Sequence, residues 1–527
     1  MLHPRIVPVI RNVFQSFVAI AVASVLSACA TSGANTGAPD AQTAGWWDTT
    51  RFLSSDAMEG RDTGSPGYNR AADYVAARFK AAGLRPAGDA GTYFQSIAFQ
   101  DIEVTTDGTS FDVAYAHHTT RPLRFLYEVG VVPTFGMVPR LDGPLVFRGY
   151  CKPSDMTGVR GAVVVCFGAR RTGQTSAADR LAAATAAGAI GIIHVDDMGF
   201  TIEPPRWPLA YARNVVFSET SARPNSIPVM RLSAPAFTDI AKASGQDGAD
   251  ILARGARGEA MPSFDVPARL VARFATRERS YASANVLAVL PGTDPTLASE
   301  PVMLVAHLDG YGYGTPVNGD NLYNGALDDA AYVATLITFA EARRGRGLRR
   351  PVILAAVTGE EKGLLGSRWL SAHPTKGAPK PVAVLNMDQL RPLYPLRILT
   401  THGLDDSTLG ARVREVAGGM GIQVRPDLEP ERNLLKRTDH WPFMQADVPA
   451  VSFLFGFEES DTDARARYRD WYEHRYHAPQ DDITTPIDFQ AQADFHRFYF
   501  ALTEAVANAD AKPAWLPTSP NRPKAGK

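Results

Sequence analysis

Cysteine is scarce in this chain. Only three cysteines occur among the 527 residues, at positions 29, 151 and 166. Three cysteines cannot build a disulfide framework, so the chain is not one of the small secreted domains that disulfides hold together. At roughly 150 residues per domain, the length instead predicts about two to four domains with hydrophobic cores of their own.

Long basic runs are absent as well. The chain carries 54 basic and 55 acidic residues, and its formal net charge is -1. We therefore expect no nucleic acid as a partner, because nucleic-acid binding requires clustered Lys and Arg. With 45% apolar and 21% charged residues, the composition is that of a soluble globular protein.

The apolar run near the N-terminus is too short for a membrane span. Residues 13–28 are apolar, but they include Gln15 and Ser16 and fall short of the about 20 residues that a bilayer requires. Arg5 and Arg11 precede this run, as they would in a signal peptide. We therefore predict a signal peptide at residues 1–28, followed by a flexible tether at residues 29–45.

The signal peptide ends in "LSAC", which resembles a bacterial lipobox with its lipidated cysteine. This resemblance implies export across the inner membrane and a lipid anchor on Cys29. Because Ala30 rather than an acid follows, the expected location in a Gram-negative host is the outer membrane, facing the periplasm. The alternative is a plain secretory signal cut after Ala28. An oxidising compartment leaves a disulfide between Cys151 and Cys166 open, but both resemble buried strand residues, and we expect free thiols.

A small α/β unit is predicted between residues 130 and 270. Strands are expected at 161–168, 189–195 and 226–233, with a helix at 177–188. The stretches "KPSDMTGVRGAVVVCFG" and "AAGAIGIIHV" resemble the protease-associated domain, which is commonly inserted into secreted peptidases. This unit has no clustered acids or histidines, so we expect the functional site elsewhere.

From residue 283 onward, expected strands and helices alternate. The strands are 284–290, 301–306, 351–358, 381–387, 396–401 and 449–455, and the helices are 330–344, 364–372, 407–418 and 488–508. This alternation predicts an α/β fold with a mostly parallel or mixed sheet flanked by helices. An amphipathic helix between Ser65 and Gly83 is expected to pack on that sheet. Such sheets bind ligands at the carboxyl ends of their strands.

Acids and histidines stand where the expected strands end. The apolar run 351–358 ends at Gly359, and the pair Glu360 and Glu361 follows at once. Residues in similar positions are His307, Asp309, Asp328, Asp329, Asp388, His477 and Asp481. Imidazole nitrogens and carboxylate oxygens are zinc ligands, and so many acids in one cleft would repel one another without a cation. The sequence therefore predicts a metal site at this edge of the sheet.

Five motifs in order carry a family resemblance. "HLDG", "GDNLYNGALDDA", "GEEKGLLGS", "LNMD" and "YHAPQDD", preceded by the opening "FLSSDAMEGRDTGSPGY", resemble the co-catalytic zinc aminopeptidases. That family includes secreted bacterial aminopeptidases, glutamate carboxypeptidase and, as a divergent branch, glutaminyl cyclase. The resemblance covers residues 46–110 and 280–510, which we predict to form the peptidase domain around the inserted unit, with a tail at 511–527.

The resemblance implies a role for each motif residue around two Zn²⁺ ions. His307 and Asp388 would bind one zinc, Glu361 and His477 the other, and Asp328 both, while Glu360 would be the general base. Asp309 would orient His307, and Asp481 would lie behind the ligands. The family also implies a cis peptide between Asp328 and Asp329. His440, in "TDHWPF", would line the cleft and contact substrate, with a structural role as the alternative.

The function that these residues imply is a lipid-anchored zinc metallopeptidase acting on peptides or proteins. We expect an aminopeptidase in which a metal-bridging hydroxide attacks and Glu360 accepts the proton. The alternatives are a carboxypeptidase, a glutaminyl cyclase-like enzyme with one zinc, or an inactive receptor or binding relative. Where the family has small residues after the bridging acid, this chain has Tyr332, which we expect beside the site and able to alter substrate preference.

Overall fold

The computed structural model describes most of the chain, namely residues 39–168, 173–197, 207–220, 227–388, 390–427 and 429–524. The predicted signal peptide, Cys29 and most of the predicted tether lie outside the described residues. Within the described part, no helix has both the length and the apolar character that crossing a membrane requires. Helix α1 (Ala41–Leu53) begins inside the segment that we expected to be tether.

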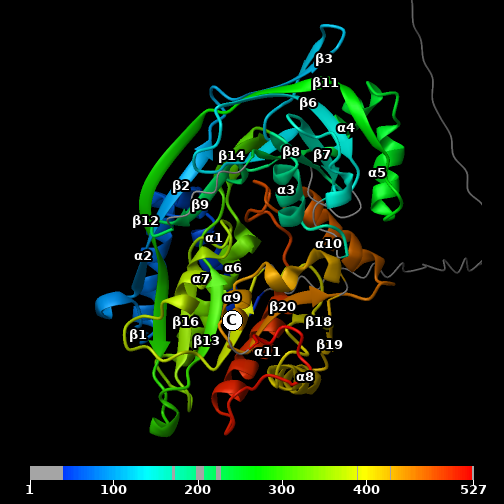
Figure 1. Cartoon of the computed structure of the whole chain (residues 1–527). Helices are drawn as coiled ribbons and strands as arrows, with labels where there is room; N and C mark the ends of the chain where they lie inside the picture. The colour runs from blue at the N-terminus through cyan, green and yellow to red at the C-terminus, as the bar shows by residue number, and fades with distance from the viewer. Residues whose placement is uncertain are drawn as a thin grey trace, which may run out of the picture.

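Two sheets organise the described residues (Figure 1). The first sheet has ten strands: in spatial order β19 (Gln423–Arg425), β18 (Ile398–His402), β20 (Ala450–Gly456), β17 (Ala383–Met387), β13 (Val302–His307), β16 (Val352–Val357), β12 (Thr276–Leu290), β2 (Phe94–Val104) and β9 (Arg213–Phe217), with β1 (Arg85–Pro86) paired to β12. The central strands β20, β17, β13 and β16 are parallel, and the strands beyond β16 are antiparallel. The prediction of a mostly parallel or mixed sheet is confirmed.

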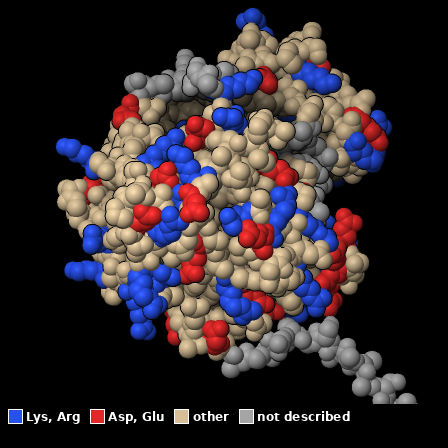
Figure 2. Space-filling model, turned by 90° about the horizontal axis from the view of Figure 1, so that it is seen from below, with Lys and Arg blue, Asp and Glu red and all other residues tan. Residues whose placement is uncertain are grey.

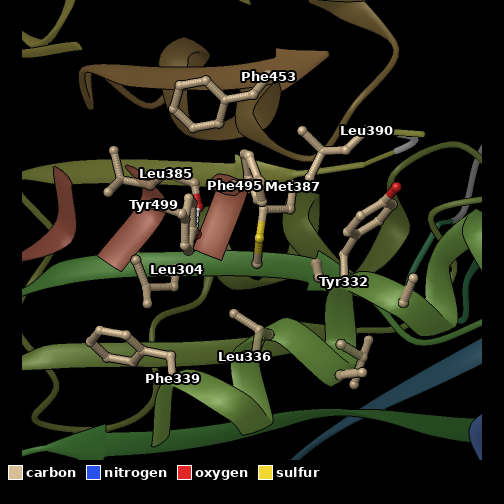
Figure 3. Packing of buried hydrophobic residues seen from close by; sticks show 14 of the residues in the cluster. Leu304, Tyr332, Leu336, Phe339, Leu385, Met387, Leu390, Phe453, Phe495 and Tyr499 are labelled. Atoms are coloured by element: carbon tan, nitrogen blue, oxygen red, sulfur yellow. Dashed lines mark hydrogen bonds between the residues drawn. The ribbon is translucent and has the colours of Figure 1, made fainter. Parts of the chain in front are cut away.

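Helices cover both faces of the first sheet. Alternate residues of β13 join different clusters, because successive strand residues point to opposite faces. Leu304 lies in the cluster with α1, α2 (Pro66–Ala81), α6 (Ala331–Arg343), α8 (Leu409–Gly419), α10 (Thr462–His474) and α11 (Phe489–Ala507). Met303 lies in the cluster with α7 (Leu365–Ala372) and α9 (His440–Gln445). Figure 3 shows Leu304 between the helices that carry Leu336 and Phe495.

The second sheet comprises eight strands in the described residues. In spatial order they are β4 (Thr120–Pro122), β3 (Ser110–Tyr115), β11 (Ser263–Arg273), β6 (Arg140–Arg148), β7 (Val163–Phe167), β8 (Gly191–Val195), β10 (Val229–Leu232) and β5 (Val129–Val132), and helices α3 (Ala177–Ala186), α4 (Ala234–Lys242) and α5 (Gly248–Ala256) accompany them. The three strands and the helix expected here from the sequence are present. The resemblance to a protease-associated domain stays a prediction.

The long strands β2 and β12 connect the two sheets. They pair over eleven residues and run from the first sheet toward the second (Figure 1). Strand β9 lies in the sequence of the expected inserted unit, yet it pairs with β2 at the edge of the first sheet. The segment just before β9 therefore lies close to the first sheet. On the face shown in Figure 2, basic and acidic side chains are interspersed.

A disulfide joins Cys151 and Cys166, so the expectation of free thiols is wrong. Cys166 lies on β7, and Cys151 follows the end of the neighbouring strand β6. The turn after β6 brings the two Cα atoms to 5.5 Å, a separation that suits a disulfide. Both residues are buried, as the sequence predicted, but the sequence did not reveal that they are neighbours.

Candidate metal centre

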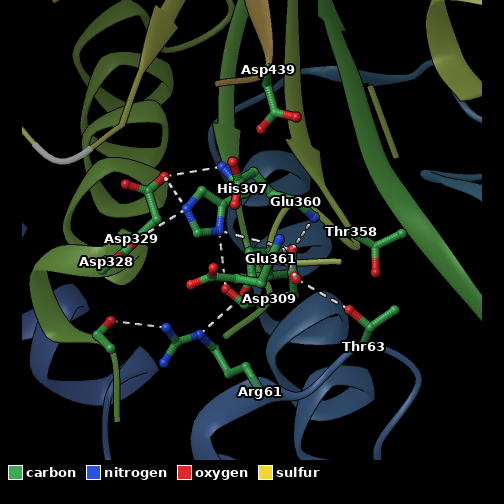
Figure 4. Close-up of polar contacts among 12 residues, drawn as sticks. Arg61, Thr63, His307, Asp309, Asp328, Asp329, Thr358, Glu360, Glu361 and Asp439 are labelled. Atoms are coloured by element: carbon green, nitrogen blue, oxygen red, sulfur yellow. Dashed lines mark hydrogen bonds and ion pairs between the residues drawn. The ribbon is translucent and has the colours of Figure 1, made fainter. Parts of the chain in front are cut away.

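The predicted ligands come from five different segments and meet at one edge of the first sheet. His307 is the last residue of β13, and Asp388 directly follows β17. Glu361 lies in the turn after β16, Asp328 in the helical turn that leads into α6, and His477 in the turn after α10. Figure 4 shows the part of this cluster that contains His307, Asp328 and Glu361.

Two groups of three potential ligands share one carboxylate. His307, Asp328 and Asp388 form one group, and Asp328, Glu361 and His477 form the other, with donor atoms within 4.8 Å of one another in each group. A third group, at the same spacing, consists of His307, Glu360 and Glu361. Nε2 of His307 lies 3.2 Å from Oδ1 of Asp328, and Nε2 of His477 lies 3.3 Å from its Oδ2. The two oxygens of Asp328 therefore face different histidines, as a carboxylate that bridges two cations would.

Several donor atoms of this cluster are buried without a hydrogen-bond partner among the described residues. They are Nε2 of His307, Oδ2 of Asp328, Oε1 of Glu361 and both carboxylate oxygens of Asp388. Buried polar atoms are almost always paired, because leaving them unpaired is costly. Nitrogen and oxygen donors at this spacing suit a zinc-type cation. The residues present therefore fit the metal that the resemblance implies.

Burial dominates the protonation behaviour of the cluster. It raises the pKa of Asp388 to about 8, and together with the neighbouring charge of Asp328 it raises the pKa of Glu361 to about 7. Burial also raises the pKa of Glu360 well above its ordinary value, and the charges of Asp388 and Glu361 add to this shift. For Asp328 burial raises the pKa, but the close contacts of its carboxylate with His307 and His477 outweigh burial, so its pKa is lowered. The acids are costly to ionise together unless a cation compensates them.

Asp309 holds the turn that carries the two glutamates. Its carboxylate accepts backbone N–H bonds from Glu360 at 3.0 Å and from Glu361 at 3.4 Å, and a hydroxyl bond from Thr63 at 3.1 Å. The ring of His307 contacts the main-chain carbonyl of Asp309 at 3.1 Å, whereas the carboxylate lies 3.8 Å from Nδ1. Asp309 thus approaches His307 mainly through its backbone carbonyl, and its role in orienting the ring stays a prediction.

Asp481 lies behind the shared carboxylate. Its side chain accepts the backbone N–H groups of Leu327 and Asp328 at 2.9 to 3.2 Å, which fixes the turn before α6. The peptide between Asp328 and Asp329 is cis, which confirms that prediction. The carboxylate of Asp329 accepts the backbone N–H of His307 at 3.0 Å. The turn is therefore tied to β13 on one side and to the loop of Asp481 on the other.

Arg61 supports the site from below, and the sequence did not single it out (Figure 4). Its side chain is completely buried and donates to four main-chain carbonyls, those of Leu53, Leu308, Asn324 and Gly325, at 2.7 to 2.9 Å. The carbonyls of Leu308, Asn324 and Gly325 belong to the segments after His307 and before Asp328, and the carbonyl of Leu53 belongs to the end of α1. The only sequence signal for Arg61 was its place in the opening motif "EGRDTG".

A cavity of about 490 Å³ opens onto the cluster. Glu360, Glu361, Asp388 and His477 lie on its lining, together with Tyr211, Tyr311, Leu364, Leu434, Trp441 and Leu454 and the basic residues Arg368, Lys436 and Arg437. A cavity of this size suits a small ligand or the end of a peptide. These aromatic, apolar and basic residues line the same cavity as Glu360. We call the edge of the first sheet where the predicted ligands meet the ligand edge.

Two residues expected beside the cavity are not part of its lining. His440 is completely buried, and its Nδ1 lies 2.6 Å from the hydroxyl of Thr438; among the described residues the cavity lining includes Thr438 but not His440. Its substrate contact stays a prediction. Tyr332 is also completely buried, and its hydroxyl accepts the backbone N–H of Arg391. The expectation that Tyr332 stands beside the site is wrong, because the first turn of α6 points this side chain into the core (Figure 3).

The fold and the site define an α/β protein whose sheet edge presents two overlapping sets of zinc-type ligands. Residues 285–502 match the family described as Peptidase family M28. A curated relative, leupeptin-inactivating enzyme 1 of Streptomyces exfoliatus, is 24% identical over 230 residues, which are 41% of this chain and 48% of the relative. The chain thus spans about half the length of that relative.

Solved structures share the fold over nearly the whole chain. An aminopeptidase from Aneurinibacillus sp. strain AM-1 is 17% identical with a TM-score of 0.57, and the match covers 92% of this chain and 97% of that one. BSAP, a zinc aminopeptidase from Bacillus subtilis, is 16% identical with a TM-score of 0.56, covering 89% and 96%. At these identities the likeness shows the fold, and it extends over both sheets.

Proposed function

We propose that this protein is a zinc metallopeptidase that removes residues from the N-terminus of peptides. The observation that carries the proposal is the shared Asp328, whose two oxygens face His307 and His477 in overlapping ligand sets beside a cavity. The match of residues 285–502 to Peptidase family M28 supports the peptidase activity. The names of the structurally similar aminopeptidases support the N-terminal specificity.

Two zinc ions would be held at the two overlapping sites. His307, Asp328 and Asp388 would hold one, and Asp328, Glu361 and His477 the other. When bound, the ions would supply positive charge that polarises a peptide carbonyl and lowers the pKa of nearby water. That charge would also compensate the buried carboxylates whose donor atoms lack hydrogen-bond partners.

Glu360 is the residue that we assign to proton transfer. It lines the cavity next to the ligands, and Asp309 fixes its backbone N–H, so its position is held from behind. As general base it would take the proton of the attacking water and return it to the amine that leaves.

The basic residues of the cavity favour one alternative, a carboxypeptidase. Arg368, Lys436 and Arg437 line the wall of the cavity, where a free carboxylate would be attracted.

Two matched sets of peptides distinguish an aminopeptidase from a carboxypeptidase. The first set has a free amine and an amidated C-terminus, and the second set is N-acetylated and has a free C-terminus. The zinc-loaded protein should release N-terminal residues from the first set only and contain about two zinc ions per chain.

Each outcome of this experiment is informative. Release of C-terminal residues from the acetylated set alone would replace the aminopeptidase by a carboxypeptidase. Cyclisation of N-terminal glutamine with about one zinc per chain would favour a glutaminyl cyclase-like enzyme. Zinc binding without turnover of any substrate would point to an inactive binding relative. Chelation followed by zinc addition is the control, because activity should disappear and return with the metal.

We also propose that the protein acts at the outer membrane, held by a lipid on Cys29. The proposal rests on "LSAC" at residues 26–29 and on Ala30 after it. The Cys29→Ala protein should appear in the soluble fraction after detergent partitioning, whereas the wild type should follow the detergent. A Cys29→Ala protein that stays in the detergent phase would contradict the anchor.

A further inference from the structure

Tyr211 lies far from the family motifs in sequence but next to one of the proposed zinc ligands. It belongs to the 3₁₀ turn Leu209–Ala212, which immediately precedes β9. Its hydroxyl hydrogen-bonds with Nδ1 of His477, 266 positions away in the chain. The two rings meet edge-on, with centroids 5.9 Å apart and an interplanar angle of 87°. Tyr211 also lines the cavity at the cluster.

The contact involves the ring nitrogen that does not face the ligand set. Nε2 of His477 points at the other ligands, 3.3 Å from Asp328 and 3.8 Å from Glu361. A histidine that ligates through Nε2 carries its proton on Nδ1, and a partner at Nδ1 fixes both the tautomer and the ring orientation. The hydroxyl oxygen of Tyr211 can accept a hydrogen bond from this Nδ1–H group, which leaves the Nε2 lone pair for a metal.

Tyr311 also approaches this ring, but in a different geometry. Its hydroxyl lies 3.3 Å from Nδ1 and 3.2 Å from Nε2 of His477. An atom almost equally far from both nitrogens lies between them, off the axis of either N–H bond, so it cannot select a tautomer. Tyr211 contacts Nδ1 and is therefore the tyrosine of the two that can do so.

The turn that carries Tyr211 is anchored on both sides. Before it, the carbonyl of the buried Trp207 accepts the hydroxyl of Thr315 at 2.7 Å. After it, Arg213 forms ion pairs with Asp62 and with the buried Asp101, the latter at 2.5 Å. Tyr211 thus reaches His477 from a fixed position, as a residue that orients a ligand must.

We propose that Tyr211 is a positioning residue for His477. The segment between β8 and β10 of the second sheet would then complete the zinc site at the edge of the first sheet. The inference rests on the proposed zinc site. It goes beyond the family match, since Tyr211 lies outside residues 285–502. Its consequence is specific to one ion: the zinc held by Asp328, Glu361 and His477 depends on Tyr211, and the zinc held by His307, Asp328 and Asp388 does not.

The Tyr211→Phe variant tests this assignment, because it keeps the ring and removes only the hydroxyl. Competition with a chromophoric chelator measures the affinity for each of two zinc ions. We expect the affinity for one ion to fall by about 10- to 100-fold, the usual effect of losing a partner of a ligating histidine, and the other to stay unchanged. Tyr127→Phe is the matched control: this residue belongs to the same unit, and its hydroxyl contacts the carbonyl of Pro316 instead.

A role in packing alone would give a different result. Phenylalanine would then preserve the zinc affinities, and equal affinities in the wild type and in Tyr211→Phe would overturn the inference while leaving the proposed function intact. A wild-type protein that binds no zinc would overturn both. The chelator-treated wild type and both variants should unfold at similar temperatures. If the unfolding temperatures are similar and Tyr211→Phe binds zinc more weakly, the lower affinity arises from the metal site and not from a loss of folded structure.

Discussion

The two sheets of this protein differ in whether they bury carboxylate oxygens that have no hydrogen-bond partner among the described residues. Among the described residues, every cluster of three or more potential metal ligands lies at the edge of the first sheet. The second sheet instead encloses a small interior cavity lined entirely by apolar side chains, among them Val113, Phe147 and Leu270. The first sheet keeps costly, unpaired carboxylates where its parallel strands end, and the second is packed for stability. Among the described residues, the candidate metal site and its unpaired carboxylates are thus confined to the first sheet.

The separation is incomplete where the sheets meet. Tyr211 and Arg213 belong to the sequence of the second unit, yet they contact His477, Asp62 and Asp101 of the first. If the comparison is right, substitutions at the ligand edge should change activity and metal content, and substitutions within the second sheet should change stability alone. The following predictions test this division in order of decreasing effect.

The largest effect is expected for the glutamate pair. Glu360→Gln keeps the shape of the side chain and removes the proton acceptor, so turnover should fall by about 10²- to 10⁴-fold while zinc content is retained. Glu361→Gln removes an anionic ligand, so one zinc should be lost on dialysis and the melting temperature should fall. Peptide hydrolysis and metal analysis on the same samples separate these outcomes. Near wild-type turnover of Glu360→Gln would refute its assignment as the base.

Arg61 should contribute strongly to stability although it is not a ligand. Arg61→Met removes the donors to four carbonyls inside the protein and leaves those carbonyls buried, so we expect a loss of about 4 kcal/mol in the free energy of unfolding. Urea denaturation measures this loss. The control is Arg70→Met in the neighbouring helix, because Arg70 is exposed, and it should change stability by less than about 0.5 kcal/mol. Equal effects of the two substitutions would contradict the support that we assign to Arg61.

The disulfide should matter to the second sheet only. Cys151 and Cys166 are 15 positions apart, and closing a loop of that size contributes about 3 kcal/mol to stability. The double substitution to Ala should therefore lower the free energy of unfolding by about that amount and leave zinc content and turnover unchanged. In a Cys29→Ser background, the unreduced and denatured protein should show no reactive thiol. Two reactive thiols before reduction would contradict the disulfide.

Periodicity and strand ends were enough to predict much of the fold and the ligand cluster. The apolar run 351–358 became β16, and Ser65 caps α2 by accepting the N–H of Tyr68. Both follow from local rules, because a buried parallel strand is continuously apolar and a serine suits the first turn of a helix. The ligand edge followed from one further rule, that the carboxyl ends of parallel strands share one edge of the sheet.

Contacts between distant segments could not be predicted in this way. The pairing of Cys151 with Cys166 and the contact of Tyr211 with His477 depend on which strands become neighbours, and no local pattern encodes this. Helix α10 was missed for another reason: its sequence is mostly charged, and only Ala464, Trp471 and Tyr472 are buried. Such a helix lacks the apolar periodicity by which helices are recognised.

The smallest expected effect is a loss of stability at low pH, and it arises at His496 of α11, which is not one of the proposed ligands. Burial lowers the pKa of His496 to about 3 from the ordinary value of 6.5, an effect that the charge of Asp40 opposes. Below pH 6.5 the unfolded chain binds a proton at this histidine that the folded protein does not, until pH 3 is approached. The stability due to neutral His496 is therefore complete above pH 6.5 and is lost as the pH falls, by about 1.4 kcal/mol per pH unit.

The His496→Gln variant removes this titration while keeping a polar group near Gln492. Between pH 6.5 and 4.5 its free energy of unfolding should fall by about 2 kcal/mol less than that of the wild type. Any acid-induced loss of zinc affects both proteins alike, so the difference between them isolates the histidine. The control is His117→Gln at an exposed turn of the second sheet. Its free energy of unfolding should fall with pH by the same amount as that of the wild type. Parallel curves for His496→Gln and the wild type would mean that other groups of the first sheet account for its acid sensitivity.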